Sequence, residues 1–232
     1  INIEEWNQIK DSKVLIIGGG PSTNDFDWNP DEYDAIISCN HFFKNEKIKN
    51  TELFMVFLGD EVDLNDRDLI NYLEKNPTLV CFENIGRNPK ELKHFKAKFT
   101  DQTLWAHTRY HSKVGAMPRI ISLICGFNPS QIDIVGMDGY IKKENRDKFS
   151  HSFQDRKSMG GTIESSNREE QILQNYKKQY LEFWDYALHD IGKKVRFKNL
   201  GHNHPCNIST EVLSEILGNN YEEYLYNIEL RS

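Results

Sequence analysis

The sequence predicts an α/β protein in which helices cover both faces of a mainly parallel sheet. Short apolar runs rich in β-branched residues recur along the chain and end at glycine or polar residues, which is typical of buried strands. Segments with apolar side chains at helical spacing lie between these runs. Strands that alternate with helices favour parallel pairing with right-handed connections. These observations together indicate a Rossmann-like architecture.

Taken in order, the apolar runs predict six strands and a seventh, shorter candidate. The strands are expected at 14–17, 34–38, 53–58, 79–82, 132–135 and 195–200, with the short candidate at 104–106. Helices are expected at 66–74, 89–98, 114–125 and 169–191. A proline is tolerated only in the first turn of a helix, so Pro118 favours a start somewhat later than Val114.

Two further segments complete the expected domain. Residues 141–166 are polar and longer than an ordinary connection, which predicts a lid loop. The chain from about 208 to 232 is expected to form a helical tail that packs on the body. We therefore expect residues 1–232 to form a single α/β domain. Because the sequence begins with Ile1 rather than Met, it is also compatible with a piece of a longer polypeptide.

Composition narrows the class of protein. With 232 residues, of which 38% are hydrophobic, the chain is long and apolar enough for one proper core. A net charge of −6 argues against a general nucleic-acid binder. No apolar run approaches the roughly 20 residues needed to span a bilayer. The four cysteines show no CxxC spacing, which favours free thiols in a reducing compartment and predicts a cytoplasmic location.

The segment Gly-Gly-Gly-Pro-Ser after the first strand is the clearest candidate for a ligand-binding loop. Gly18, Gly19 and Gly20 allow positive φ and a close backbone approach to a ligand, and the exposed amides of such a turn suit a phosphate. Thr23 stands where a dinucleotide fingerprint needs its third glycine, and residues 24–27 favour a turning loop over a helix. We interpret this as a nucleotide loop without the NAD signature. A glycine-rich turn without a ligand is the alternative.

Polar residues follow several of the other predicted strands. Ligands of parallel α/β sheets bind outside the carboxyl ends of the strands, so these residues are expected to meet at one edge. The candidates are 18–22, 39–41, 59–60, 136–140 and 201–205.

These segments resemble a known family. The loop at 18–22, Cys-Asn-His-Phe at 39–42, Val-Gly-Ala-Met at 114–117 and Gly-Met-Asp-Gly-Tyr at 136–140 fall in the order found in bacterial CMP-sialic acid-dependent sialyltransferases of the Campylobacter type. The chain is also similar to motility-accessory-factor glycosyltransferases and archaeal pterin pyrophosphokinases, which share the Gly-Pro-Ser loop and the Gly-x-Asp strand end. The resemblance covers roughly residues 13–200.

The resemblance implies roles for particular residues. Those expected to bind the nucleotide are Gly18, Gly19, Gly20, Pro21, Ser22, Asn40, Gly115, Gly136 and Asp138. Tyr140 takes the place of a tyrosine that stabilises the leaving phosphate, and His151 is the nearest match to a second lid tyrosine. The family's catalytic histidine, just before the long helix, has no counterpart here, and Gly59-Asp60 replaces an asparagine after the third strand.

Transfer from a CMP-sugar requires a base for the acceptor hydroxyl and stabilisation of the departing phosphate. His151 is the first candidate base, because it lies in the polar lid, and a solvated loop residue is the alternative. His202 and His204, in a polar turn that matches no zinc pattern, are further candidates. Two Asp-x-Asp strings occur, at 25–27 and 66–68; the second is expected to begin a helix, and no metal site is predicted at either.

The function expected from these features is inverting, metal-independent transfer of sialic acid or another nonulosonate from a CMP-activated donor to a glycan acceptor, as in bacterial cell-surface glycan biosynthesis. The alternatives are a Mg²⁺-dependent pterin-type pyrophosphokinase and a non-catalytic nucleotide-binding domain. No cofactor besides the nucleotide-sugar substrate is expected, and no nucleic-acid partner. Peripheral membrane association and homo-oligomerisation remain open.

Overall fold

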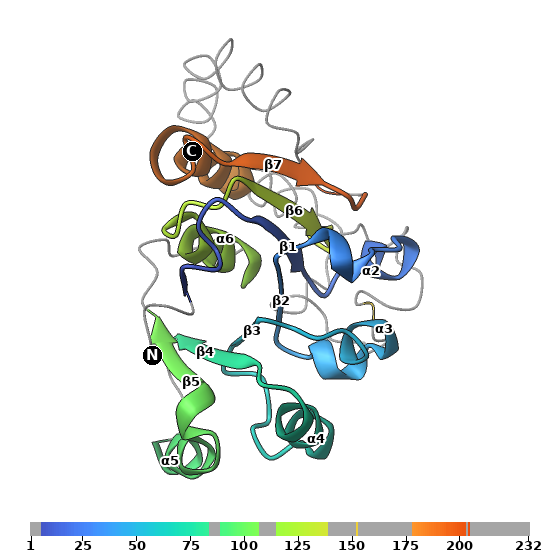
Figure 1. Ribbon diagram of the computed structural model, residues 1–232, viewed down its shortest axis with the longest axis vertical. Helices are drawn as coiled ribbons and strands as arrows, with labels where there is room; N and C mark the ends of the chain where they lie inside the picture. The colour runs from blue at the N-terminus through green and yellow to red at the C-terminus, as the bar shows by residue number, and fades with distance from the viewer. Residues whose placement is uncertain are drawn as a thin grey trace, which may run out of the picture.

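The computed structural model describes residues 6–83, 89–106, 115–138, 152, 178–202 and 204. Within them the chain forms a seven-stranded sheet in the order β5-β4-β3-β2-β1-β6-β7 (Figure 1). Every neighbouring pair is parallel, which confirms the predicted Rossmann-like α/β fold. The strands are β1 (Lys13–Ile17), β2 (Ala35–Cys39), β3 (Met55–Leu58), β4 (Leu79–Glu83), β5 (Thr103–Ala106), β6 (Gln131–Val135) and β7 (Arg196–Asn199).

Helices connect the strands on both sides of the sheet (Figure 1). The α-helices are α2 (Ser22–Asp25), α3 (Glu46–Lys49), α4 (Arg67–Lys75), α5 (Pro89–Lys98) and α6 (Met117–Cys125). Short 3-10 turns are η1 (Pro30–Glu32), η2 (Phe42–Lys44) and η3 (Thr100–Gln102). Residues 178–186 are helical and continue into a π-helical turn, η5 (Ala187–Ile191), before β7.

Both faces of the sheet are packed, which explains the continuous apolar runs. Along β1, Val14 and Ile16 belong to a core shared with α6 and the helix that precedes β7. Leu15 and Ile17 point to the other face, into a core shared with α3 and α4. All four side chains are fully buried. A strand covered on both faces needs apolar residues at every position rather than at every second one.

The strand order reverses at β1. Strands β2 to β5 extend from one side of β1, whereas β6 and β7 lie on its other side. Connections that leave two adjacent strands in opposite directions open a crevice at the carboxyl ends of those strands. In this chain the reversal lies between β1 and β6, so the loops that follow these two strands mark the expected ligand-binding edge.

Two details of the predicted elements are corrected. A turning loop was expected at residues 24–27, but the first two of these residues belong to the single helical turn α2, which buries Ser22 and Thr23. The segment between β2 and β3, for which no helix was predicted, contains η2 and α3. Asn45 begins α3, because its side-chain oxygen accepts hydrogen bonds from the N–H groups of Lys47 and Ile48. Pro118 lies in the first turn of α6, as expected.

Other expectations are confirmed or fall outside the described residues. Cys39, Cys81 and Cys125 are buried free thiols, whereas Cys206 is not among the described residues. Of the predicted lid at 141–166 only Ser152 is described, and the predicted tail at 208–232 lies outside the description. None of the described helices combines the length and apolar character needed to cross a bilayer.

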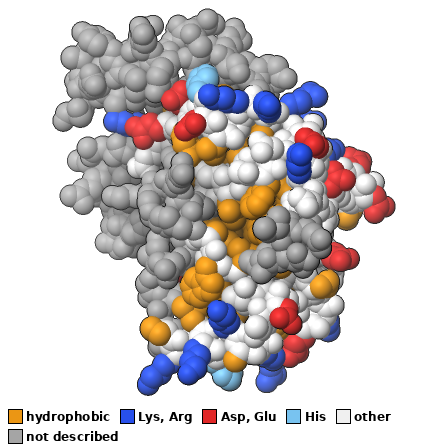
Figure 2. Space-filling model, turned by 60° about the vertical axis from the view of Figure 1, so that its left-hand side comes forward, with side chains coloured by type: hydrophobic (Ala, Val, Ile, Leu, Met, Phe, Trp, Pro, Cys, Tyr) orange, Lys and Arg blue, Asp and Glu red, His pale blue; other side chains and the backbone are white. Residues whose placement is uncertain are grey.

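Basic side chains gather at the end of the molecule formed by α5. Figure 2 shows Lys and Arg side chains clustered at its lower end, where Lys90, Lys93, Lys96 and Lys98 are exposed. Lys98 pairs with Glu74 of α4 at 2.6 Å. Phe95 is buried on the opposite side of the same helix. The basic residues of α5 are therefore carried by its solvent-facing side.

Candidate functional site

The loops after β1 and β6 pack directly against each other. The Gly18 N–H donates to the Val135 carbonyl at 2.8 Å, and the Gly20 N–H donates to the Gly136 carbonyl at 2.9 Å. The Thr23 hydroxyl donates back to the Gly18 carbonyl at 2.9 Å. These bonds hold the predicted nucleotide loop rigidly at the carboxyl edge of the two central strands.

The glycines of this loop were predicted to allow positive φ and close approach to a ligand, but the structure shows a different reason for them. Positive φ is found not at residues 18–20 but at Gly136 (73°) and Gly115 (92°) among the described glycines. A methyl group on Gly20 would lie 2.5 Å from the Asp138 carboxylate, and one on Gly18 would overlap the Gly136 carbonyl. Glycine is needed here because two protein segments approach closely, so the glycines by themselves do not indicate a ligand.

Ser22 and Asp138 form a buried clamp between the two loops. The Asp138 side chain accepts a hydrogen bond from the Ser22 N–H at 2.7 Å and a second one from the Ser22 hydroxyl. The Ser22 hydroxyl also accepts from the Gly136 N–H at 3.1 Å. Burial raises the pKa of Asp138, and the Ser22 hydrogen bonds oppose that rise. The sequence predicted both residues at the site, and the structure joins them to each other.

Ser152 ties the predicted lid to the same loop. Its N–H donates to the Gly19 carbonyl at 2.9 Å, and its carbonyl accepts from the Asn24 amide at 2.9 Å. Asn45 links to the Asn24 side chain at 2.9 Å. The Ser152 hydroxyl is buried and has no hydrogen-bond partner among the described residues. The chain at residue 152 therefore lies directly over the nucleotide loop.

An exposed imidazole–carboxylate pair lies beside the clamp. His202 Nε2 is 2.8 Å from the Asp25 carboxylate, which joins the exit of β7 to the end of α2. The two side chains are 54% and 63% exposed, so a ligand at this edge has access to them. The two members of the pair act in opposite directions on the pKa of Asp138: the charge of His202 lowers it and the charge of Asp25 raises it, both less strongly than burial. A carboxylate in this position can orient a histidine that acts as a base.

His204, the other candidate base in this turn, has a different environment. Its Nδ1 lies 2.6 Å from the Met137 carbonyl, and its Nε2 accepts from the Trp184 indole at 3.3 Å. Tyr180 packs edge-on against the ring at 4.5 Å. Burial lowers the pKa of His204 to about 4. Both ring nitrogens already have protein partners, which argues for a neutral, structural histidine and against its use as the base.

Asn40 lies where it was predicted, at the exit of β2 next to the loop after β1. It is one of three described non-glycine residues with positive φ, at 48°. Its side-chain oxygen accepts from the Gly59 N–H at 2.8 Å, and its Nδ2 donates to the Glu61 carboxylate at 2.7 Å. Asn40 therefore connects the exits of β2 and β3 and orients Glu61, a residue that sequence reasoning missed.

The first turn of α6 completes the edge. Gly115 is exposed, and a methyl group there would meet no atom within 4 Å. The Met117 sulfur lies 3.1 Å from the position of a methyl group on Gly18, so α6 begins beside the nucleotide loop. Arg119 lies half-buried over the Phe57 ring at 5.9 Å. The amides at a helix N-terminus attract anions, and the N-terminus of this nine-residue helix lies beside the loop after β1.

The Asp-x-Asp strings do not form a metal site within the described residues. In the first string Asp25 pairs with His202, whereas Asp27 pairs with Lys47 at 2.6 Å, and this ion pair lowers the pKa of Asp27. In the second, Asp66 accepts from the Asp68 N–H and begins α4, as predicted. No group of three His, Cys, Asp or Glu side chains suited to a metal occurs in the part of the chain that the structure describes.

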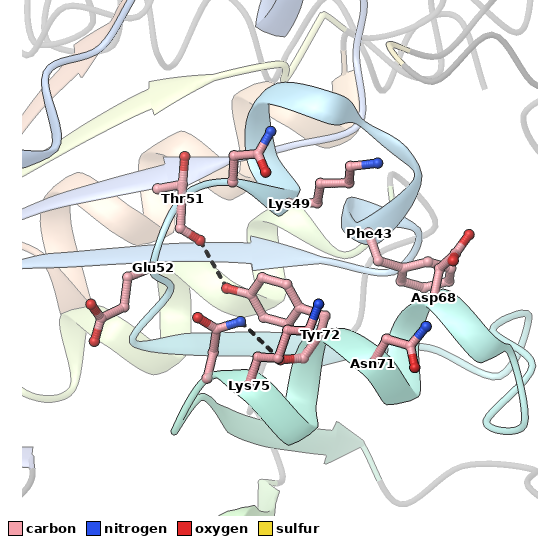
Figure 3. A pocket seen from close by; sticks show the side chains of 10 residues that line it. Phe43, Lys49, Thr51, Glu52, Asp68, Asn71, Tyr72 and Lys75 are labelled. Atoms are coloured by element: carbon pink, nitrogen blue, oxygen red, sulfur yellow. Dashed lines mark hydrogen bonds between the residues drawn. The ribbon is translucent and has the colours of Figure 1, made fainter.

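A separate cavity of about 470 Å³ lies between α3 and α4 (Figure 3). Its lining is mixed in charge, with Lys49 and Lys75 near Glu52 and Asp68. The Tyr72 hydroxyl at its base is already engaged, since it donates to the Thr51 carbonyl at 2.9 Å. None of the predicted site residues lines this cavity.

Two predicted catalytic residues, Tyr140 and His151, lie outside the described residues. Sequence reasoning also missed the partner of His202, because Asp25 and His202 are 177 residues apart and only the topology joins them. The Asp25-Phe26-Asp27 string drew attention to Asp25 only as part of a possible metal-binding motif.

No known family model matches the chain, and a comparison with curated proteins finds no match.

Proposed function

We propose that this chain is a glycosyltransferase that moves sialic acid or a related nonulosonate from a CMP-activated donor to a glycan acceptor, with inversion and without a metal. The observation that carries the proposal is the exposed His202–Asp25 pair beside a rigid loop at the point where the strand order reverses. The resemblance of the strand-end motifs to bacterial sialyltransferases supports the choice of donor.

The phosphate of the donor is proposed to lie between the loop after β1 and the first turn of α6. The helix N-terminus favours negative charge at this place, because α6 begins beside the loop after β1. The Ser22–Asp138 clamp keeps the loop in one conformation, so the site needs little rearrangement when the donor binds. The cytidine is proposed to extend over β2 and β3, where Asn40 lies.

In the proposed reaction the acceptor oxygen attacks the anomeric carbon of the sugar. The bond from that carbon to the phosphate oxygen breaks, and CMP leaves with the bonding electrons. His202 takes the proton of the acceptor hydroxyl, and Asp25 stabilises the imidazolium that forms. Tyr140 keeps the role that the resemblance implies, which is stabilisation of the departing phosphate. His151, the base candidate suggested by its place in the polar lid, is kept as the alternative base.

The test is the release of CMP from CMP-sialic acid in the presence of EDTA, with and without galactoside acceptors. We expect wild-type turnover, and a loss of about 100-fold or more in kcat for His202→Gln. His189→Gln is the matched control, because His189 pairs with Asp185 at 2.7 Å in η5, before β7 rather than after it. That variant is expected to keep wild-type turnover.

Other outcomes separate the alternatives. Loss of turnover in His151→Gln but not in His202→Gln would assign the base to His151. Binding of CMP without turnover would favour a non-catalytic nucleotide-binding domain. Activity that requires ATP, Mg²⁺ and a pterin would replace the transferase proposal with a pyrophosphokinase.

A further inference from the structure

The exits of β2 and β3 present an exposed carboxylate that the predicted site residues do not include. Glu61 is exposed, and Asn40 holds its Oε1 at 2.7 Å. A methyl group on Gly59 would lie 2.7 Å from Glu61 Oε2, so the carboxylate lies close to the glycine that follows β3. The hydrogen bond from Asn40 thus orients a charged side chain at the carboxyl edge of the sheet.

The bond between Asn40 and Glu61 is not required to shape this edge. The Asn40 side-chain oxygen already joins the two strand exits by accepting from the Gly59 N–H at 2.8 Å. The Asn40 N–H adds a backbone bond to the Phe57 carbonyl at 2.9 Å. The remaining amide donor of Asn40 therefore orients Glu61, whose carboxylate retains acceptor sites beyond the one that Asn40 uses.

The place of this carboxylate in the fold indicates its ligand. In open parallel sheets an acidic side chain at the end of the second strand accepts hydrogen bonds from ribose hydroxyls, while the phosphate lies at the loop after the first strand. Here Asn40 stands at the end of β2, and it presents a carboxylate from the exit of β3 instead. The carboxyl ends of β1 and β3 are about 10 Å apart, two strand spacings, so a ribose bound at Glu61 would lie over the exit of β2 with its phosphate toward the loop after β1.

We infer that Glu61 binds the ribose hydroxyls of the nucleotide and makes the site selective for ribonucleotides over 2′-deoxyribonucleotides. This inference rests on the nucleotide site of the proposed function. A carboxylate accepts strong, charge-assisted hydrogen bonds from hydroxyl groups and repels phosphate. The ribose therefore lies over β2 and β3, and the phosphate lies toward β1 and α6.

The test is calorimetric titration of CMP, 2′-deoxy-CMP, AMP and 2′-deoxy-AMP into the wild-type chain and into Glu61→Gln. The wild type is expected to bind CMP about tenfold more tightly than 2′-deoxy-CMP, since a missing hydroxyl leaves the carboxylate without its partner. Glu61→Gln is expected to reduce this ratio to twofold or less. Glu46→Gln removes an exposed carboxylate paired with Lys49 at 2.6 Å and is expected to keep the wild-type ratio.

The outcomes distinguish this inference from the proposed function. If CMP binds but the ratio is near one in the wild type, or unchanged in Glu61→Gln, the role of Glu61 is overturned and the CMP site stands. If only the AMP pair binds, with a ribose preference that Glu61→Gln removes, Glu61 keeps its role and the CMP donor is overturned. Failure of all four nucleotides to bind overturns both.

Discussion

Two regions of the carboxyl edge differ in how their polar groups are used. At the exits of β1 and β6, Ser22 and Asp138 are buried and bond to each other. At the rim of the same edge, the His202–Asp25 pair and Glu61 are exposed to solvent. The first region, the clamp, consists of Ser22, Gly136 and Asp138; the second, the rim, consists of Asp25, Glu61 and His202.

The difference separates residues that build the site from residues that can contact a ligand. A buried polar group needs its protein partner, so its loss costs stability. An exposed polar group exchanges water for a ligand at little cost to the fold. Clamp variants are therefore expected to change stability, whereas rim variants are expected to change binding and turnover.

The largest effect is expected from Asp138→Ala. The change leaves the N–H and the hydroxyl of Ser22 without their acceptor in a buried place. We expect a loss of about 3 kcal/mol in the free energy of unfolding, measured by urea denaturation. Asp138→Asn, which keeps one acceptor oxygen, should lose less. Equal stability of Asp138→Ala and wild type would show that the clamp does not hold the loops.

A smaller loss is expected from Gly18→Ala. The added methyl group overlaps the Gly136 carbonyl, and that overlap costs about 1–3 kcal/mol in a packed interior. Gly115→Ala is the matched control, since its added methyl group would meet open space. The loss in the free energy of unfolding, about 1 kcal/mol, is then expected only from the positive φ at this position. Urea denaturation of both variants gives the comparison. A greater loss for Gly115→Ala would contradict the packing argument.

His204 is expected to make stability depend on pH. Its pKa is lowered to about 4 in the folded chain, against about 6.5 in an unfolded one. The unfolded chain therefore binds the proton first, and the stability that neutral His204 contributes is lost as pH falls from about 6.5 toward 4. His204→Gln retains a donor for Met137 and an acceptor for Trp184 without titrating.

The difference in unfolding free energy between wild type and His204→Gln, measured from pH 7.5 to 4.5, isolates this effect from that of Asp138. The pKa of Asp138 is raised, so its contribution has the opposite sign and is lost as pH rises. A difference that does not vary with pH would contradict a buried, neutral His204.

The smallest change in stability is expected at the rim. His202→Gln alters an exposed side chain, so the free energy of unfolding should stay within about 0.5 kcal/mol of the wild type while CMP release falls. Urea denaturation of the same preparation used for the activity assay measures this directly. A large loss of stability in His202→Gln would show that His202 stabilises the fold, as the clamp residues are expected to do.

The fold could be predicted from the sequence, because each buried strand is marked by an apolar pattern in a few consecutive residues. The run at 14–17 is apolar at every position since both faces of β1 are covered, and that pattern is visible without a structure. The predicted strand ends also meet at one edge, since parallel strands bring their carboxyl ends together.

The contacts within the site were not predictable in the same way. Gly18 and Gly20 were predicted to bind the nucleotide, whereas the structure shows that they pack closely against residues 136–138, more than 110 positions away. The Asn40–Glu61 bond depends on how the turn after β3 is shaped, and no local pattern marks Glu61. Helix α3 depends on the side chain of Asn45, a signal too short to stand out in a polar segment.

The central claim is that the carboxyl edge of the sheet, from the loop after β1 to the exits of β2 and β3, holds a cytidine nucleotide without a metal. Calorimetric titration of CMP into the wild-type chain in EDTA tests it most directly, with ATP and Mg²⁺ titrated in parallel. We predict saturable binding of CMP that is unchanged when Mg²⁺ replaces EDTA. Binding of ATP with Mg²⁺ and none of CMP would contradict the claim.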